Sequence, residues 1–196
     1  DGLRAGPPPR PPAGTSVYIN YAAKVEERYN KYKDVYQAVL GSSSGVEIYP
    51  KVLAYLREYQ AEGRGLRRPV VHGDPVFSNA LLTGQNEVIF LDMRGALASE
   101  LTTEGDALYD LSKVYQSLCG YDYVLLDQPL LDPDVQLLGS LRAVFVSFVS
   151  KHYPGVRPRD VEMITASHYL SLIPLHKNTS HHIKFYQFAV ALARDD

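Results

Sequence analysis

The residues that decide the fold are VHGDPVFSN at 71–79 and, after a short interval, IFLDMR at 89–94. Residues 69–72 have the composition of a short strand, and Asp74 follows them closely. Pro75 biases the backbone of Asp74 away from helical geometry, because a proline ring crowds the residue before it. The sequence therefore predicts a carboxylate on a stiff loop at the end of a strand.

A β-hairpin is predicted immediately after this loop. Residues 80–82 and 87–92 have strand composition, and the polar residues between them supply a turn. Asn79 stands at the entry to the hairpin and Asp92 at its exit, so both side chains are expected to approach Asp74. Two carboxylates and an amide form an oxygen-rich set suited to Mg²⁺ that also holds substrate phosphates. This is the equipment that phosphoryl transfer needs.

Helical periodicity surrounds the hairpin. Apolar and aromatic residues recur at helical spacing, with glycines after the first two helices and prolines at the start of two later ones. The predicted fold class is mainly α with a small central β-hairpin (α+β). The expected helices span 17–40, 49–62, 106–119, 134–152, 159–175 and 180–193.

Composition excludes several classes of protein. A net charge of −2 argues against a nucleic-acid binder that neutralises many phosphates. Cys119 is the single cysteine, which excludes a disulfide framework and a cysteine-based zinc site and suits a reducing, cytoplasmic location. Charges interrupt every apolar stretch before the length of a membrane span, so no membrane association is expected. Residues 1–15 are rich in proline and are expected to be a linker or the start of an excerpt, followed by one domain over 16–196.

The motifs around the hairpin resemble those of a known superfamily. The pattern His72-x-Asp74-x-x-x-x-Asn79 resembles the catalytic loop of protein kinases and, more closely, of aminoglycoside phosphotransferases and choline kinases. Asp92 sits where that superfamily has its second metal-binding aspartate. Residues 105–111, GDALYDL, resemble the stretch that opens the next helix in the same enzymes. The sequence of the loop also resembles that of kinase-like proteins linked to capsular polysaccharide synthesis.

The resemblance implies a role for each of these residues. Asp74 would be the catalytic aspartate that steers the proton of a substrate hydroxyl, and Asn79 and Asp92 would hold Mg²⁺ with the phosphates of ATP. His72 would support the loop that carries Asp92, and Asp110 would anchor the catalytic loop through its backbone. The implied reaction transfers the γ-phosphate of Mg·ATP to a small-molecule hydroxyl, such as that of an amino alcohol, a sugar or an aminoglycoside.

The family pattern is incomplete in this chain. An upstream β-rich lobe with a phosphate-covering loop and a paired lysine is expected in a complete kinase. Neither precedes His72, since Lys24, Lys31 and Lys33 lie on a predicted helix. The chain is therefore expected to be the carboxy-terminal lobe of a protein kinase-like fold, with the amino-terminal lobe elsewhere in the same polypeptide. A non-catalytic binding module and a metal-dependent phosphate ester hydrolase remain alternatives.

Other charged residues allow more than one interpretation. Arg94 could pair with Asp74, contact a transferred phosphate or form a surface salt bridge. Asp106 is a candidate helix cap. An acidic pocket for a cationic substrate could form from Glu100, Glu104 and Asp122, against the ordinary reading of a solvated face.

Two further clusters have ordinary structural interpretations. His176, His181 and His182 suggest a metal site, but no acidic or cysteine partner falls at ligand spacing, which favours surface histidines. Arg64, Arg67 and Arg68 are expected on a solvated basic loop, although phosphate binding is an alternative. The fifteen tyrosines are expected to pack with their hydroxyls at the surface.

Overall fold

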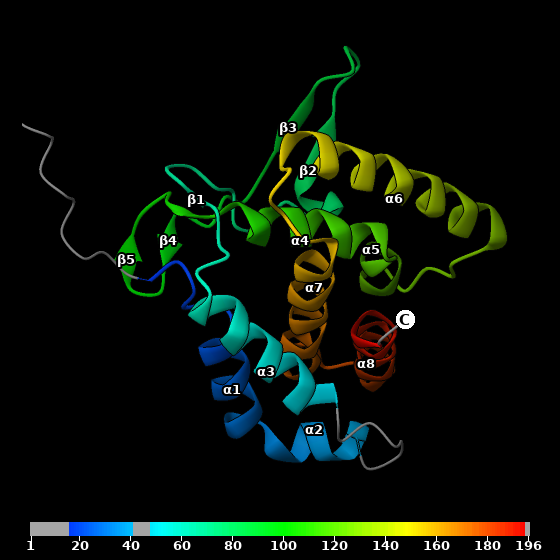
Figure 1. Ribbon diagram of the computed structural model, residues 1–196. Coiled ribbons are helices and arrows are strands. Elements are labelled where there is room, and N and C mark those ends of the chain that lie inside the picture. The colour runs from blue at the N-terminus through cyan, green and yellow to red at the C-terminus, as the bar shows by residue number, and fades with distance from the viewer. Residues whose placement is uncertain (1–15, 41–47, 195–196) are drawn as a thin grey trace, which may run out of the picture.

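Helices make up most of the fold, as the periodicity predicts. A computed structural model describes residues 16–40 and 48–194 of the chain (Figure 1). The expected linker at 1–15 and the glycine-rich break after the first predicted helix lie outside the described residues. None of the helices within the described ranges combines the length and apolar character that a membrane crossing needs.

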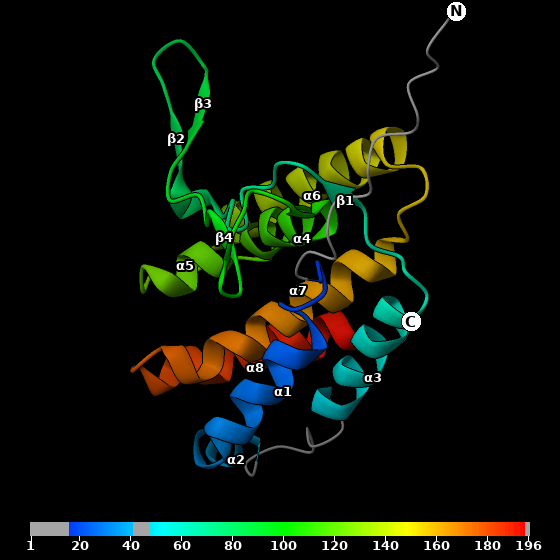
Figure 2. The same ribbon diagram turned by 90° about the vertical axis from the view of Figure 1, so that its left-hand side faces the viewer.

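The core is built around α7 (Pro158–Leu172), which runs through the middle of the molecule (Figures 1 and 2). It packs most extensively against α8 (Thr179–Ala193) and α4 (Ala107–Leu118). Met163 and Tyr169 of α7 are fully buried. Pro158 is the first residue of α7, where the missing N–H of proline costs nothing, so the predicted helix start is confirmed.

The first predicted helix is two helices, α1 (Ala22–Lys31) and α2 (Lys33–Leu40). The break occurs at Tyr32, whose backbone has φ −123° and ψ 38°. No glycine or proline marks this point, and so the periodicity gave no sign of it. After the break, Tyr36 is buried and its hydroxyl donates to the carbonyl of Leu170 at 2.8 Å, so α2 is tied to α7.

Within residues 16–40 and 48–194 the strands form three separate antiparallel pairs. The predicted hairpin is confirmed as β2 (Ala80–Leu82) and β3 (Val88–Phe90), and it projects away from the helices in Figure 1. The other two pairs join β1 (Arg67–Arg68) to β6 (Gly105–Asp106) and β4 (Ala96–Leu97) to β5 (Glu100–Leu101).

The prediction of a strand over residues 69–72 is wrong. The strand ends at Arg68, because Pro69 has no N–H with which to continue the ladder. Residues 69–72 are an extended connection, in which Val71 N–H donates to the carbonyl of Thr103 at 2.8 Å. Asp74 therefore follows an extended loop and not a strand.

The remaining helices follow the prediction with shifted ends. They are α3 (Ile48–Ala61), which begins just after the undescribed segment, and α6 (Asp132–His152), which has Pro133 in its first turn. The short helix α5 (Tyr121–Leu125) was not predicted, and neither were the β1–β6 and β4–β5 strand pairs. The end of the helix predicted over 159–175 is a 3₁₀ turn at Ile173–Leu175, called η3. A second 3₁₀ turn, η2 (Phe77–Asn79), leads from the Asp74 loop into β2.

Candidate active site

The loop that carries Asp74 is held by the carboxylate of Asp110. The backbone N–H of His72 donates to Asp110 Oδ2 and that of Gly73 to Asp110 Oδ1, both at 2.7 Å. Burial raises the pKa of Asp110, although these two donors oppose the change. The predicted contact between Asp110 and the loop backbone is thus confirmed, and the first turn of α4 fixes the start of the loop.

Gly73 is required by the backbone at this point. Its φ of 84° lies in the left-handed region, and a Cβ there would meet the Arg94 side chain at 2.7 Å. Arg94 N–H in turn donates to the carbonyl of His72 at 2.9 Å. The two sequence motifs are therefore in direct contact, because the residues after Asp92 lie against the Asp74 loop.

Asp74 presents its two carboxylate oxygens differently. Oδ1 is covered and lies 3.1 Å from the ammonium of Lys113, whose side chain is 13% exposed. The Asp74 side chain as a whole stays 44% exposed. His72 Nδ1 accepts a hydrogen bond from Asp74 N–H at 3.2 Å, which places the His72 ring in a supporting position. One oxygen is thus held by a cation, and Oδ2 remains for an approaching hydroxyl.

Asn79 lies beside Asp74, as the spacing predicts. Its Nδ2 donates to the backbone carbonyl of Asp74 at 3.0 Å and lies 3.4 Å from Oδ2. The carbonyl of Asn79 accepts from Leu91 N–H at 2.8 Å, which sets the start of the hairpin against its end. Because the amide nitrogen is bound to Asp74, the amide oxygen is the atom left to ligate a metal.

Asp92 stands at the exit of the hairpin in the left-handed region, with φ 57°. Aspartate tolerates this conformation better than most residues. Within the described part of the chain, its exposed carboxylate has no hydrogen-bond or ion-pair partner. The oxygen donors of Asn79 and Asp92 fit a hard cation such as Mg²⁺. Residues 16–40 and 48–194 contain no group of three or more His, Cys, Asp or Glu arranged around a metal position.

Arg94 does not pair with Asp74 among the described residues. Its guanidinium lies over the ring of buried Tyr109, 5.3 Å from the centroid. The Tyr109 hydroxyl accepts from Lys24 at 3.1 Å. Burial would raise the pKa of Tyr109, but Lys24, Lys113 and Arg94 outweigh burial and lower it. Three cations from separate elements therefore converge on this phenol.

The far side of the loop is also anchored. Phe77 N–H donates to Ser117 Oγ and Ser78 N–H to Asp122 Oδ1, both at 2.9 Å. Glu100, Glu104 and Asp122 do not come together as the acidic pocket that was the alternative to a solvated face. Asp122 binds loop backbone, Glu104 forms an exposed ion pair with an arginine of β1, and Glu100 lies exposed on β5.

Asp106 organises the entry to α4. It caps the helix by accepting from Leu108 N–H, which confirms the predicted role. It also accepts from the hydroxyls of Tyr21 and Tyr59 at 2.7 and 2.6 Å and from Leu66 N–H at 2.8 Å. Burial, together with the carboxylate, raises the pKa of both tyrosines. The expectation that tyrosine hydroxyls lie at the surface is wrong here, since these hydroxyls satisfy a buried carboxylate.

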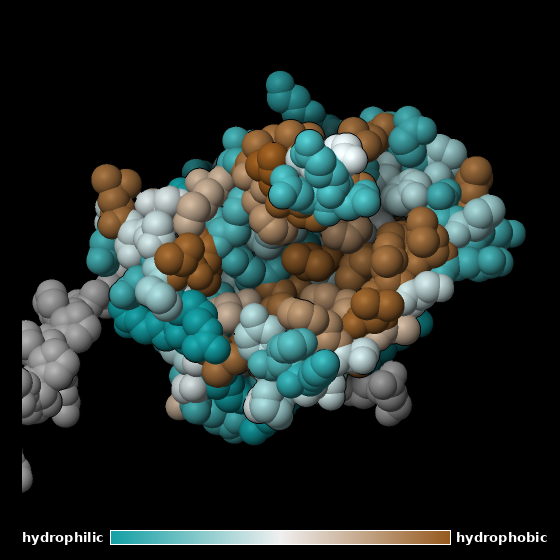
Figure 3. All heavy atoms as spheres, turned by 90° about the horizontal axis from the view of Figure 1, so that it is seen from above, coloured by the Kyte–Doolittle hydropathy of each residue, from teal (hydrophilic) through white to brown (hydrophobic). Residues whose placement is uncertain are grey.

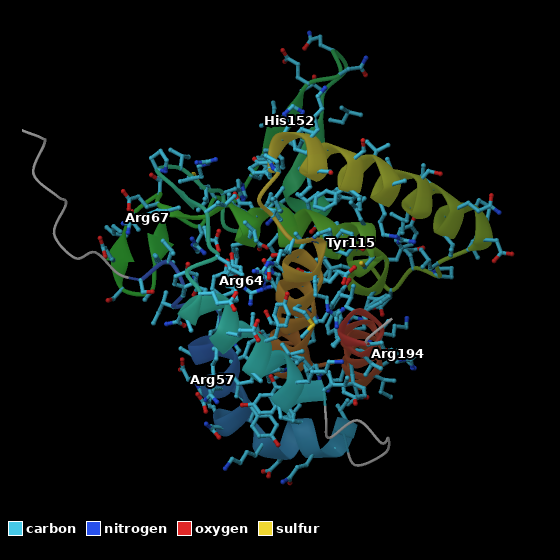
Figure 4. The ribbon with its side chains drawn as sticks, in the orientation of Figure 1. Arg57, Arg64, Arg67, Tyr115, His152 and Arg194 are labelled. Atoms are coloured by element: carbon cyan, nitrogen blue, oxygen red, sulfur yellow. The ribbon has the colours of Figure 1, made fainter. Side chains whose placement is uncertain are left out.

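Arg64 is buried rather than solvated. Its guanidinium donates to the buried carboxylate of Asp160 at 2.7 Å, and Figure 4 shows it where α3 meets α7. Arg67 is half-exposed and pairs with Glu104 away from this junction (Figure 4). Arg64 thus forms a structural pair with buried Asp160, and Arg67 forms a surface pair.

The histidine cluster is not at the surface either. His181 and His182 are buried, and His181 Nε2 lies 2.7 Å from Asp127 Oδ1. His181 Nδ1 lies 3.4 Å from the Nδ1 of His176, and His182 Nε2 bonds the carbonyl of His176 at 2.6 Å. The acidic partner comes from a distant segment, which spacing could not reveal. Hydrogen bonds within the protein satisfy these rings.

The motifs did not identify Lys113, which binds Asp74, or Lys24, which binds the Tyr109 hydroxyl. Lys113 follows Asp110 by three residues and Tyr109 by four, so helical spacing on α4 would have placed it on the same face. Lys24 comes from α1, and nothing in the local sequence connects it to α4. Comparison of the chain with family models, with curated proteins and with solved structures gave no match.

Proposed function

We propose that this chain is the carboxy-terminal lobe of a small-molecule kinase that transfers the γ-phosphate of Mg·ATP to a hydroxyl group. The observation that carries the proposal is the set of contacts around Asp74. Its loop is clamped by Asp110, one of its oxygens is held by Lys113, and its other oxygen lies beside Asn79. A carboxylate positioned in this way suits the steering of an attacking hydroxyl.

Each residue has a defined part in this reaction. Asp74 Oδ2 would accept a hydrogen bond from the substrate hydroxyl and take up its proton as the oxygen attacks. Lys113 would keep the carboxylate in this orientation. The Asn79 amide oxygen and the Asp92 carboxylate would hold Mg²⁺, which when bound neutralises the phosphate charges and orients the transferred group. His72 and Asp110 act through the loop and not on the substrate.

The exposed surface of the hairpin favours the presence of a further lobe over this site. Its apolar side chains are exposed on both faces of the ribbon, with Leu82 71%, Val88 57% and Ile89 48% exposed. Seen from above in Figure 3, brown apolar side chains gather around a hollow on this side of the molecule. Exposed apolar surface of this kind marks an interaction site. We infer that a nucleotide-binding lobe in the same polypeptide covers the hairpin.

The first experiment is calorimetric titration of Mg·ATP into the chain and into its Asp92→Ala variant. We expect binding that requires Mg²⁺ and that the variant loses. A matched control is Asp34→Ala on α2, which should bind like the parent chain because this residue lies on a helix outside the site. Binding unchanged by Asp92→Ala, or release of phosphate from a monoester without ATP, would contradict the kinase assignment.

A further inference from the structure

A second hollow lies along α1, the helix whose Lys24 contacts Tyr109 of α4. It is a groove of about 410 Å³ bounded by one face of α1, by Ala98 in the β4–β5 turn and by Leu175 in η3. Figure 2 shows α1 running below this turn. The motifs of the kinase resemblance include none of the residues that line it.

The groove is lined by an excess of positive charge. Lys24, Arg28 and Lys31 line it from α1, and Glu27 is the carboxylate among its lining residues. Lys24 donates to a phenol and Arg28 to the backbone carbonyl of Ser171 at 2.8 Å. Within the described residues, none of the three cations is ion-paired with a carboxylate. Their charge is therefore left for a ligand.

The groove is linked to the residues around Asp74 through Tyr109 of α4. Lys24 Nζ lies 3.1 Å from the hydroxyl of Tyr109, which lies one turn before Lys113 on α4. Lys113 Nζ lies 3.1 Å from Asp74 Oδ1. Burial would raise the pKa of Tyr109, but Lys24 and Lys113 both lower it, so both ammonium groups act on this phenol. The Arg94 guanidinium also lies over the Tyr109 ring.

We propose that the acceptor is an alcohol that already carries an anionic group, a phosphate or a carboxylate, which this groove binds while the hydroxyl meets Asp74. The proposal rests on the proposed kinase function and names its substrate class. Cations on a partly buried helix face form charge-assisted hydrogen bonds to such anions. A cationic alcohol would instead meet like charge, and the acidic residues that could have attracted it lie elsewhere.

The proposed reaction transfers one phosphoryl group from ATP to the acceptor. The hydroxyl oxygen of the acceptor forms a bond to the γ-phosphorus of ATP, and the bond between that phosphorus and the bridging oxygen breaks. ADP leaves with the electron pair of the broken bond. The hydroxyl proton passes to Asp74 and then to water. The product carries its original anionic group and one new phosphate monoester.

The test measures binding without nucleotide and product formation with Mg·ATP. The probes are glycerol 3-phosphate, glycerate, glycerol, choline and inorganic phosphate, each titrated by calorimetry. We expect the two anionic alcohols to bind and glycerol and choline not to bind. Inorganic phosphate tests whether the anion alone is sufficient, and glycerate against glycerol 3-phosphate distinguishes a carboxylate from a phosphate.

Matched variants assign the binding to the groove. Lys24→Gln and Lys31→Gln should each weaken binding of the anionic alcohol by about tenfold, the effect of one charge-assisted hydrogen bond. Lys33→Gln, an exposed lysine on α2 that does not line the groove, should leave binding unchanged. Lys31 is also exposed, so its variant keeps the test valid if Lys24→Gln fails to fold.

The outcomes separate this proposal from the one it rests on. Anion binding through Lys24 and Lys31, with a phosphorylated product, supports both. Mg·ATP binding with no preference for anionic alcohols overturns the substrate class and leaves the kinase assignment standing. Anion binding that depends on the groove lysines, together with Mg·ATP binding that Asp92→Ala leaves unchanged, overturns the kinase assignment and with it the acceptor role of the groove.

Discussion

The ammonium of Lys113 lies 3.1 Å from Oδ1 of Asp74, one helical turn beyond the carboxylate that clamps the Asp74 loop. A single helix, α4, therefore positions the loop backbone through Asp110 and the loop carboxylate through Lys113. Because Asp74 is 44% exposed, solvent screens this ion pair and limits what it adds to stability. We expect this ion pair mainly to fix the orientation of the Asp74 carboxylate.

Lys113→Met should therefore separate activity from stability. We expect turnover of Mg·ATP with the best acceptor to fall by about a hundredfold, similar to the loss of other positioning contacts. The midpoint of urea unfolding should change little. Lys113→Arg, which keeps the charge, should recover part of the turnover. A variant that unfolds as easily as it loses turnover would show that the pair is structural.

Gly73→Ala should destabilise the loop for two distinct reasons, and Gly63 provides the control for one of them. Both glycines have left-handed backbones, with φ 84° and 65°. A Cβ on Gly73 would meet the Arg94 side chain at 2.7 Å, whereas a Cβ on Gly63 would have no neighbour within 4 Å. Gly63→Ala should cost about 1 kcal/mol from backbone strain alone.

Gly73→Ala should cost more than Gly63→Ala, because Arg94 must also move. Urea unfolding of both variants measures the difference. We further expect Gly73→Ala to lower turnover, since the loop that carries Asp74 would shift. Equal losses of unfolding free energy in the two variants would show that Arg94 yields without cost.

The sequence predicted local order well and long-range partners poorly. The hairpin and the helices follow from local composition and periodicity. The Asp110 contact joins residues 37 and 38 positions apart, and it was expected from the family resemblance and not from local pattern. The approach of Lys24 to Tyr109 joins residues 85 positions apart. Asp127 and His181 are separated by 54 positions. No spacing rule connects such residues, because packing of whole helices decides whether they meet.

Burial was the other property that local pattern could not supply. Arg64, His181 and Tyr59 belong to residue types that are often solvated or only partly buried. The sequence suggested solvated positions for Arg64 and His181 and a surface position for the Tyr59 hydroxyl. Each is buried because a distant carboxylate receives it: Asp160, Asp127 and Asp106 respectively. Asp160 and Asp106 are themselves buried, whereas the Asp127 side chain is 66% exposed, so a polar side chain can be covered while its partner stays at the surface.

Asp106→Asn should be among the most destabilising single changes in the chain. The carboxylate accepts four hydrogen bonds, including those from the Tyr21 and Tyr59 hydroxyls. An amide has one acceptor oxygen and would direct an NH₂ toward some of these donors. We expect a loss of about 3 kcal/mol or more in the free energy of unfolding.

Tyr59→Phe measures one of these bonds alone and should cost about 1 kcal/mol. Combining it with Asp106→Asn should give less than the sum of the two losses, since the variants share a partner. Chemical denaturation of the three variants tests this. Additive losses would mean that Tyr59 and Asp106 are not coupled.

Stability is expected to fall as the pH drops from about 7 to 5, and His168 is expected to be one cause. The ring of His168 is buried, with Nε2 bonded to Ser112 Oγ at 2.8 Å. Burial, with Lys113 and Lys24 nearby, lowers the pKa of His168 well below its ordinary value of 6.5. The folded state therefore keeps the ring neutral while the unfolded chain takes up a proton below pH 6.5. Its contribution is present above that pH and is lost as the pH falls.

His168→Gln should reduce this dependence on pH. The variant loses stability at pH 7.5 because the packing of the ring against Tyr109 is removed, but the change in unfolding free energy between pH 7.5 and 5 should be smaller than in the parent chain. His152→Gln, an exposed residue at the end of α6, should leave the slope unchanged. Urea titrations at four pH values are sufficient, and an unaltered slope in His168→Gln would assign the acid sensitivity to other groups.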